Sequence, residues 1–333
     1  MKTLTILVPV LNEEENLPVL RSRLDPVLKG LEPKLQAEII ILDNCSQDGT
    51  RAVAHAICAS DPRWKYVRYS RNFGYHNSLA AGYDLASGDA LIVLAGDLQE
   101  PPELIPRMVD LWEQGNDVVY GVLEERNDSN IVKTLGAKVF YELIYKVSET
   151  PLPKSATDFR IIGRRVIDVV RSMREPDRYL RGMVHWTGFR QASFRYDREK
   201  RVRGTSTAGI LYSANWAINA IICFSAAPLR LAAYVGLMTM LITALASIYF
   251  VWARFFPPQW MPVPPTGTTF LILLLLLAIG LNAFFLGIIG EYVGRIYSQG
   301  KFRPLYVIEE CINLKVQNSI GSPMPAGGRR TDD

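Results

Sequence analysis

The residues best suited to chemistry follow a short apolar run at residues 91–94. Four apolar residues in a row fit a strand buried on both faces, and Asp97, Gln99 and Glu100 come just after it. Open α/β sheets bind ligands at the carboxyl ends of their strands, and Mg²⁺ prefers oxygen ligands. The sequence has no GxGxxG motif and no Walker lysine to hold a phosphate. We therefore expect Asp97 to hold a divalent cation that binds phosphate.

A second acid ends the strand that we predict over residues 38–42. Asp43 opens a loop, residues 43–50, that leads into a helix predicted over 51–59. An acid at a strand end beside a helix start suits a base or the hydroxyl groups of a ribose. Asp-Gly turns and aspartate caps are also purely structural devices, so both interpretations of this loop stay open.

A frame of alternating strands and helices must position these loops. Strands are predicted over 4–10, 38–42, 64–69 and 91–94, and helices over 12–28, 51–59 and 75–86. Repeated alternation of this kind predicts an α/β fold, with a mostly parallel sheet covered by helices on both faces.

Two long uncharged runs predict a pair of transmembrane helices. Leu231–Ala253 and Phe270–Ile289 each have about the 20 residues needed to cross a bilayer. Buried helices of a large soluble core are the alternative. Basic residues crowd before the first run and after the second, whereas the connector 254–269 holds one. The positive-inside rule then predicts a multi-pass protein of the inner membrane with both termini in the cytoplasm.

A third uncharged stretch lies at residues 206–228. Polar residues interrupt its apolar face, which favours interfacial amphipathic helices over a third span. The chain then divides into a cytoplasmic domain (1–205), this interfacial segment, a two-helix hairpin with its connector (229–291) and a cytoplasmic tail (292–333). A small hairpin often packs against partners, which leaves a homo-oligomer open.

Composition narrows the function classes. The 333 residues carry a net charge of +4, and the basic cluster at 190–203 lies beside the membrane segments. Such a cluster favours lipid or phosphate over nucleic acid. The four cysteines have no metal-binding spacing and fit reduced thiols of the cytoplasm. The N-terminal apolar stretch is too short for a signal peptide.

Several motifs occur in an order that resembles glycosyltransferase family 2. Within that family the chain is most similar to the polyprenyl-phosphate sugar transferases, the group of the bactoprenol glucosyltransferases and dolichol-phosphate mannose synthases. The motifs extend over nearly the whole chain: Val8–Glu13, Asp43–Thr50, Arg71–Gly74, Gly88-Asp89, Asp97–Pro102, Asp158–Arg160, Arg178–Gly182 with Trp186, Arg198–Ser206, Phe224–Arg230, Gly290–Tyr292 and Arg303-Pro304.

The resemblance implies a GT-A type nucleotide-sugar-binding fold, a nucleotide-sugar donor and a polyprenyl phosphate acceptor in the membrane. It implies Mg²⁺ or Mn²⁺ as the cofactor. The residues it assigns are Asp97 and Gln99 for the metal; Pro9, Asn12, Glu13, Asp43 and Asn72 for the nucleotide; Arg126, Arg198 and Arg201 for the acceptor phosphate; and Asp158 as the catalytic carboxylate, with Arg160 and Arg181 around it.

Two positions depart from the family pattern. The metal motif is normally Asp-x-Asp, and here Ala95 replaces the first acid. The nucleotide loop is normally Asp-Asp-Gly-Ser, and here Asn44 and Cys45 follow Asp43. One carboxylate with waters and a diphosphate still fits Mg²⁺, because this ion keeps several waters.

Asp158 has two chemical interpretations and one structural one. A phosphomonoester has a second pKa of about 6, so a lipid phosphate is largely ionised at neutral pH and needs placement more than deprotonation. Asp158 is then either a general base or a residue that orients sugar and acceptor. A structural pair with Arg160 is the third interpretation.

Taken together with this resemblance, the sequence predicts an inverting transferase. It would move a hexose from UDP to undecaprenyl phosphate at the cytoplasmic face, with inversion because the phosphate attacks directly. A processive polysaccharide synthase is one alternative, although the chain lacks the Gln-x-x-Arg-Trp motif of those enzymes. A catalytically impaired, membrane-tethered scaffold that binds nucleotide sugars is the other, suggested by Ala95.

Overall fold

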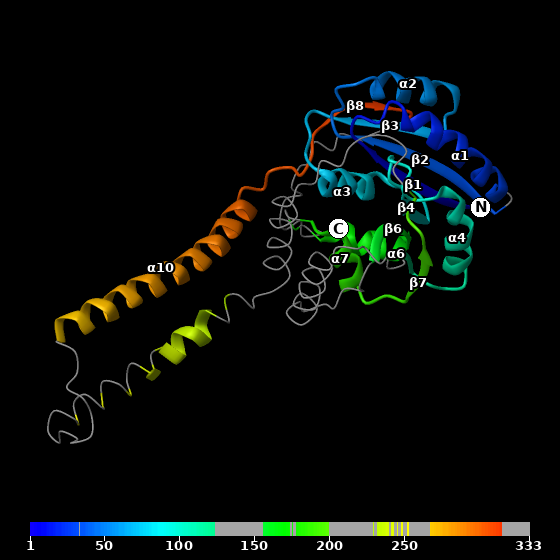
Figure 1. Cartoon of the computed structure of the whole chain (residues 1–333). Helices are drawn as coiled ribbons and strands as arrows, with labels where there is room; N and C mark the ends of the chain where they lie inside the picture. The colour runs from blue at the N-terminus through cyan, green and yellow to red at the C-terminus, as the bar shows by residue number, and fades with distance from the viewer. Residues whose placement is uncertain are drawn as a thin grey trace, which may run out of the picture. The chain divides into compact units, whose positions relative to one another are not determined.

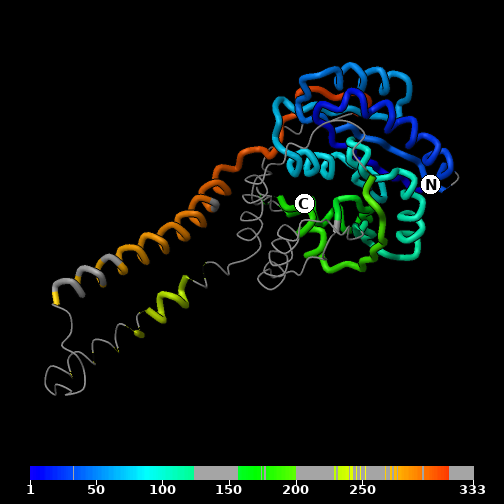
Figure 2. Tube along the Cα trace, viewed as in Figure 1, coloured from blue at the N-terminus to red at the C-terminus, as the bar shows by residue number. Residues whose placement is uncertain are grey.

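The computed structural model describes residues 1–32, 34–123, 156–173, 175, 178–199 and 267–314, with residue 229 and short pieces between 232 and 252 (Figure 1, Figure 2). The chain splits into two compact units. The first contains Met1–Lys146, Thr150–Ala214 and Phe302–Asp333, and the second contains Val147–Glu149 and Asn215–Lys301.

The first unit is built on a mixed, mostly parallel sheet with the strand order β7-β5-β6-β4-β1-β2-β3-β8. Strands β4, β1, β2 and β3 are parallel to one another, whereas β6 and β8 join them in antiparallel pairings. The strands are β1 Lys2–Val10, β2 Leu35–Asp43, β3 Trp64–Tyr69, β4 Ala90–Val93, β5 Val118–Leu123, β6 Ala156–Gly163, β7 Gln191–Tyr196 and β8 Ile308–Ile312. The predicted α/β class with a mostly parallel sheet is confirmed.

Helices cover both faces of this sheet. Alternate residues of β2 point to opposite sides, so that Ile39 and Ile41 join one apolar cluster while Ile40 and Leu42 join the other. Both faces are therefore buried, as the continuous apolar runs predict. The helices of the first unit are α1 Asn16–Leu31, α2 Thr50–Ser60, α3 Tyr75–Leu85, the 3₁₀ turn η1 Pro102–Leu104, α4 Ile105–Glu113, α6 Arg164–Ser172 and α7 Leu180–Trp186.

The first helix begins later than predicted. Helix α1 begins at Asn16, whereas the acidic pattern places its start at Asn12. Asn12 has φ 59°, a left-handed conformation that a helix does not accept, and its side-chain oxygen takes the Gln47 N–H. Residues 12–15 therefore belong to a loop at the edge of the sheet instead of a helix.

The end of the chain returns to the same sheet. Strand β8 pairs antiparallel with β3, with Arg68 opposite Glu310. Residues 308–312 lie in the segment 292–333, the predicted cytoplasmic tail, where the sequence predicts a strand or a helix of uncertain type up to Lys315. The first unit is thus completed by residues that follow helix α10, Gly267–Gly300, in sequence.

One helix of the described residues is long and apolar enough to cross a membrane. Helix α10, Gly267–Gly300, contains a candidate span over Leu277–Gly300. Its 34 residues extend about 50 Å at 1.5 Å per residue, and many of its apolar side chains, including Leu271 and Phe284, are mostly exposed. The helix covers the second predicted span and continues past Glu291. The first predicted span, 231–253, lies mostly outside the described residues, although 232–239 are helical; residues 206–228 lie wholly outside them.

Gly88, two residues before β4 begins, allows the chain to approach β1 closely. A Cβ on Gly88 would lie 2.7 Å from Thr5 Oγ1 and 2.8 Å from the Thr3 carbonyl oxygen, and the next residue, Asp89, accepts the Thr3 N–H at 2.7 Å. Backbone atoms of a central strand cannot yield, so Gly88→Ala should lower the free energy of unfolding by about 1–3 kcal/mol. Thermal unfolding in detergent measures this change.

Gly30→Ala is the matched control. No atom lies within 4 Å of a Cβ at Gly30, which is in helix α1, so this change should be neutral or stabilise the protein by up to about 1 kcal/mol. Equal melting temperatures for the two variants would contradict the close packing at Gly88.

Candidate active site

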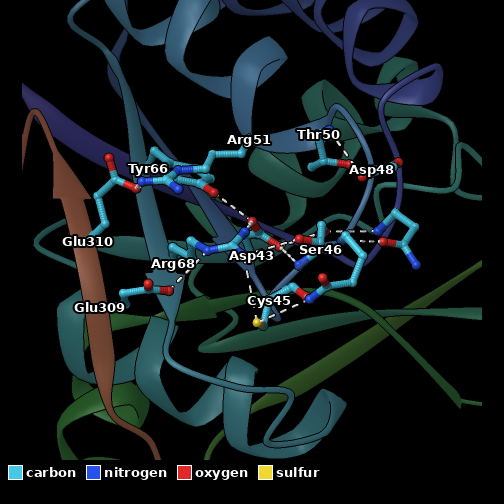
Figure 3. Close-up of polar contacts among 12 residues, drawn as sticks. Asp43, Cys45, Ser46, Asp48, Thr50, Arg51, Tyr66, Arg68, Glu309 and Glu310 are labelled. Atoms are coloured by element: carbon cyan, nitrogen blue, oxygen red, sulfur yellow. Dashed lines mark hydrogen bonds and ion pairs between the residues drawn. The ribbon is translucent and has the colours of Figure 1, made fainter.

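Asp43 holds the loop 43–50 from inside. Its side chain is completely buried and accepts hydrogen bonds from the Ser46 amide (2.8 Å) and hydroxyl (2.6 Å), from the Tyr66 hydroxyl (2.5 Å) and from Arg68 Nη1 (2.8 Å), as Figure 3 shows. A carboxylate has about four acceptor positions, and these protein donors occupy them. Asp43 therefore shapes the loop and offers little capacity for a direct bond to a ligand.

Backbone contacts join this loop to the loop after β1. The Asn12 N–H donates to Ser46 Oγ (2.9 Å), and the Glu13 N–H donates to Thr50 Oγ1 (2.8 Å). Pro9 lies beside Leu42 in the β1–β2 register, one residue before the strands end at Val10 and Asp43. Four of the predicted nucleotide residues, Pro9, Asn12, Glu13 and Asp43, are thus gathered at one edge of the sheet.

The loop after β3 reaches the same place. The Phe73 N–H donates to the Asn44 side-chain oxygen at 3.0 Å, which ties this loop to the residue after Asp43. Asn72, the fifth predicted nucleotide residue, accepts the Gly74 N–H at 2.8 Å and so sets the turn before helix α3. The side chain of Asn72 is exposed at this edge.

The loop after β4 carries the two predicted metal ligands, Asp97 and Gln99. Asp97 Oδ1 accepts the Gln99 N–H at 3.2 Å, and Leu98 between them has φ 60°. Among the described residues, no group of three or more His, Cys, Asp or Glu could hold a metal ion alone. Oxygen ligands from Asp97 and Gln99 fit Mg²⁺ or Mn²⁺ when a diphosphate and water supply the rest.

Glu100 binds the backbone of Ala95, the residue that replaces the first acid of the metal motif. Its Oε2 accepts the Ala95 N–H at 2.9 Å, and the side chain is buried. Burial raises the pKa of Glu100 to about 7, and the nearby carboxylates of Asp158 and Asp97 add to the rise. The sequence marks Glu100 only as an oxygen-bearing neighbour of Asp97, yet the structure makes it a buried member of the site.

Asp158 lies between two guanidinium groups. Arg160, two residues along strand β6, and Arg181, on helix α7, both pair with its carboxylate, the latter at 2.9 Å. Burial would raise the pKa of Asp158, but Arg181 and Arg160 hold it well below its ordinary value. Asp158 is therefore ionised and already bonded at neutral pH, which makes it a poor proton acceptor.

The predicted phosphate-binding arginines are only partly described. Arg198 is exposed just after β7, and the neighbouring Glu199 N–H donates to the Gln99 carbonyl oxygen at 3.0 Å. Arg198 is thereby placed beside the loop that carries Asp97, and its charge acts on Glu100. Arg126 and Arg201 lie outside the described residues.

The structure places two further residues near the site, His76, which the sequence leaves uninformative, and Arg68, which the sequence does not single out. The His76 ring packs edge-on against Tyr75 and Tyr179, and burial lowers the pKa of His76 although Asp158 acts against this. Nothing in the spacing marks a lone histidine. Arg68 could have been noticed, because Tyr66 and Arg68 share one face of a strand next to the one that ends in Asp43.

The family follows from a comparison with known sequences. The sequence model described as "Glycosyl transferase family 2" matches residues 5–171. The chain belongs to glycosyltransferase family 2. It is therefore a glycosyltransferase. The loops after β1, β2, β3 and β4 and the residue Asp158 all lie within the matched region.

Relatives of this glycosyltransferase align over nearly all of it. An uncharacterized glycosyltransferase of Synechocystis is 36% identical and covers 94% of this chain and 96% of its own length. A bactoprenol glucosyl transferase of Shigella phage SfV is 33% identical, covering 92% and 98%. A prophage bactoprenol glucosyl transferase homolog of Escherichia coli is 32% identical, with the same coverage. The predicted resemblance to the polyprenyl-phosphate sugar transferases is confirmed.

Solved structures are less similar. Glucosyl-3-phosphoglycerate synthase of Mycobacterium tuberculosis, in complex with Mn²⁺, UDP-glucose and phosphoglyceric acid, is 16% identical to this glycosyltransferase. The match covers 67% of this chain and 79% of that chain with a TM-score of 0.44.

Proposed function

We propose that this GT-A type glycosyltransferase moves a hexose, with inversion, from UDP to undecaprenyl phosphate at the cytoplasmic face of the membrane. One combination of features in this chain carries the proposal. The region that matches family 2 contains the loop with Asp97, and an apolar helix of 34 residues follows that region in sequence. An acceptor that is itself a membrane lipid accounts for that combination. Relatives named bactoprenol glucosyl transferase, aligned over more than nine-tenths of the chain, support it.

The donor would bind across the loops after β1, β2 and β3. Asn12, Glu13 and the loop 43–50 face the nucleotide in this proposal, and Asp97 with Gln99 would hold Mg²⁺ or Mn²⁺. Bound there, the ion would act as a Lewis acid that stabilises the leaving diphosphate by several kcal/mol. The Leu98 conformation and the Asp97–Gln99 contact keep both side chains on one tight turn.

Arginine side chains would bind the phosphate of the acceptor. Arg198 lies beside the Asp97 loop, and we place Arg126 and Arg201 in the same role, because a guanidinium binds phosphate with two parallel hydrogen bonds. The phosphate attacks the sugar directly, which inverts the anomeric centre. Asp158 acts as a positioning residue for Arg160 and Arg181 in this scheme, since its lowered pKa makes it a weak base.

The membrane arrangement is part of the proposal. Helix α10 and the run 231–253 would form a hairpin with both termini in the cytoplasm, and residues 206–228 would lie at the interface. The hydrocarbon core is about 30 Å thick, so a helix of 34 residues is longer than a membrane crossing requires.

A donor screen tests the function. Membranes containing the full chain are incubated with undecaprenyl phosphate, Mg²⁺ and one radiolabelled donor at a time: UDP-glucose, UDP-galactose, UDP-N-acetylglucosamine or GDP-mannose. We expect one UDP-hexose to give a chloroform-soluble labelled lipid. No lipid product with any donor would overturn the proposal, and a long polymer would favour a processive synthase.

A further inference from the structure

We propose that Arg68 and Glu309 position the loop 43–50, which makes β8, a strand encoded after the membrane segment, a working part of the donor site. The proposal rests on the proposed function in one respect, namely that this loop binds the donor nucleotide. Arg68 and Glu309 are positioning residues here, because they act through the loop and touch no reacting atom.

Arg68 divides its guanidinium between the loop and β8. Its Nη1 donates to Asp43 Oδ2 at 2.8 Å, its Nη2 to the Ser46 carbonyl oxygen at 3.1 Å, and its Nε to Glu309 Oε2 at 3.1 Å. Figure 3 shows the guanidinium between Asp43 and Glu309. Since a guanidinium is planar and rigid, the Nε contact to Glu309 fixes the direction in which the two terminal nitrogens point.

The orientation of the Arg68 guanidinium matters because the Asp43 carboxylate that it pairs with is buried. The Asp43 side chain is fully buried and that of Arg68 is 11% exposed, whereas Glu309 is 49% exposed. A buried carboxylate needs a well-placed cation, because an unpaired charge in the interior is costly. The exposed Glu309 adds little stability of its own. Its contribution is the geometry of Arg68, and through Arg68 the shape of the loop.

Strand β8 also holds the far end of the loop. Glu310 pairs with Arg51 at 2.8 Å and lies 3.0 Å from His55, and both partners are on helix α2, which begins where the loop ends at Thr50. Asn313 donates from its side chain to the Cys58 and Trp64 carbonyl oxygens at 2.9 Å. The loop is thus held at its start through Arg68 and at its exit through α2.

Glu309→Gln tests the relay with little risk to folding, because the residue is half exposed. The variant removes the charge and keeps the shape, so the donor KM should rise roughly threefold to fivefold with kcat unchanged. Cys45, in the loop and 3.7 Å from Arg68 Nη2, gives a second readout. Its rate of alkylation without donor, measured by peptide mass spectrometry on the full chain in detergent, should rise, whereas Cys311 on β8 should react as before.

Glu32→Gln is the matched control. Glu32 is 54% exposed and pairs with Arg63 at 2.9 Å, at the end of helix α1 away from the loop. This change should alter neither the donor KM nor Cys45 alkylation. If Glu309→Gln behaves like Glu32→Gln in both measurements, or changes alkylation without changing KM, the relay is wrong. If no nucleotide sugar is used at all, the proposed function fails, while Cys45 alkylation still decides whether Glu309 holds the loop.

Discussion

Asp97→Asn should reduce sugar transfer at least about 10³-fold. Asparagine keeps the size of the side chain but loses the negative charge that would hold a divalent cation beside the diphosphate. Lewis-acid stabilisation of several kcal/mol is lost with the ion, and each 1.36 kcal/mol corresponds to a factor of ten in rate. Initial rates of labelled lipid formation across a Mg²⁺ titration measure the effect, with melting temperature as a check on folding.

Ala95→Asp is the informative companion to this variant. It restores a second acid near Asp97, next to the backbone N–H that Glu100 now accepts. We expect it to stay active and to reach half-maximal rate at an equal or lower Mg²⁺ concentration. Normal transfer by Asp97→Asn would mean that the loop after β4 takes no part in the chemistry.

Asp158→Asn should slow transfer about 10²-fold or more and also destabilise the first unit. Arg160 and Arg181 would lose their shared countercharge. Removing one partner of a buried ion pair lowers the free energy of unfolding by up to about 3–5 kcal/mol. Because the pKa of Asp158 is lowered in the folded state, its stabilisation is present above the ordinary value of 3.8 and is lost as the pH falls through the folded pKa. The stability difference from wild type should therefore be constant between pH 5 and 8 and shrink only below about pH 4.

The pH profile of activity separates a base from a positioning residue. If Asp158 only orients its arginines, the acidic limb follows the acceptor phosphate near pH 6 and keeps that midpoint in Asp158→Asn. Glu100→Gln serves as the control, since burial raises the pKa of Glu100 to about 7. Because the Asp158 carboxylate also raises the pKa of Glu100, the comparison is made in the Glu100→Gln background. A midpoint that still moves when Asp158→Asn is added there would show that Asp158 takes the proton.

Local patterns were enough to predict the strands of the central sheet. The strand 64–69 has the predicted bounds, and the strands predicted at 91–94 and 38–42 differ from the observed ones by a few residues. Buried strands are easy to recognise because they are continuous apolar runs. The Asp158–Arg160 pair was also foreseeable, since residues two apart on a strand share a face. The start of α1 was not, because Asn12 adopts its left-handed conformation through a contact with Gln47, 35 residues away.

Contacts between distant segments lay beyond the sequence. Arg181 meets Asp158 only because helix α7 packs against helix α6, which itself packs against β6, and no spacing in the sequence encodes that arrangement. Glu309 and Arg68 are 241 residues apart, and an edge strand of five residues is too short to give a clear pattern. The loops that the sequence assigns to the nucleotide lie together at one edge of the sheet, and their role remains a prediction. The residues that support them come from elsewhere in the chain.

The pairing of β8 with β3 has a consequence for biosynthesis. During translation, β3 leaves the ribosome long before β8, so the sheet carries an unpaired edge while helix α10 is being made. At about 5–20 residues per second, the 241 residues from Arg68 to Glu309 take on the order of tens of seconds. We expect the loop 43–50 to reach its final form only after that interval, so that a nascent chain stalled before residue 308 would contain helix α10 but would still hold this loop without its contacts to β8.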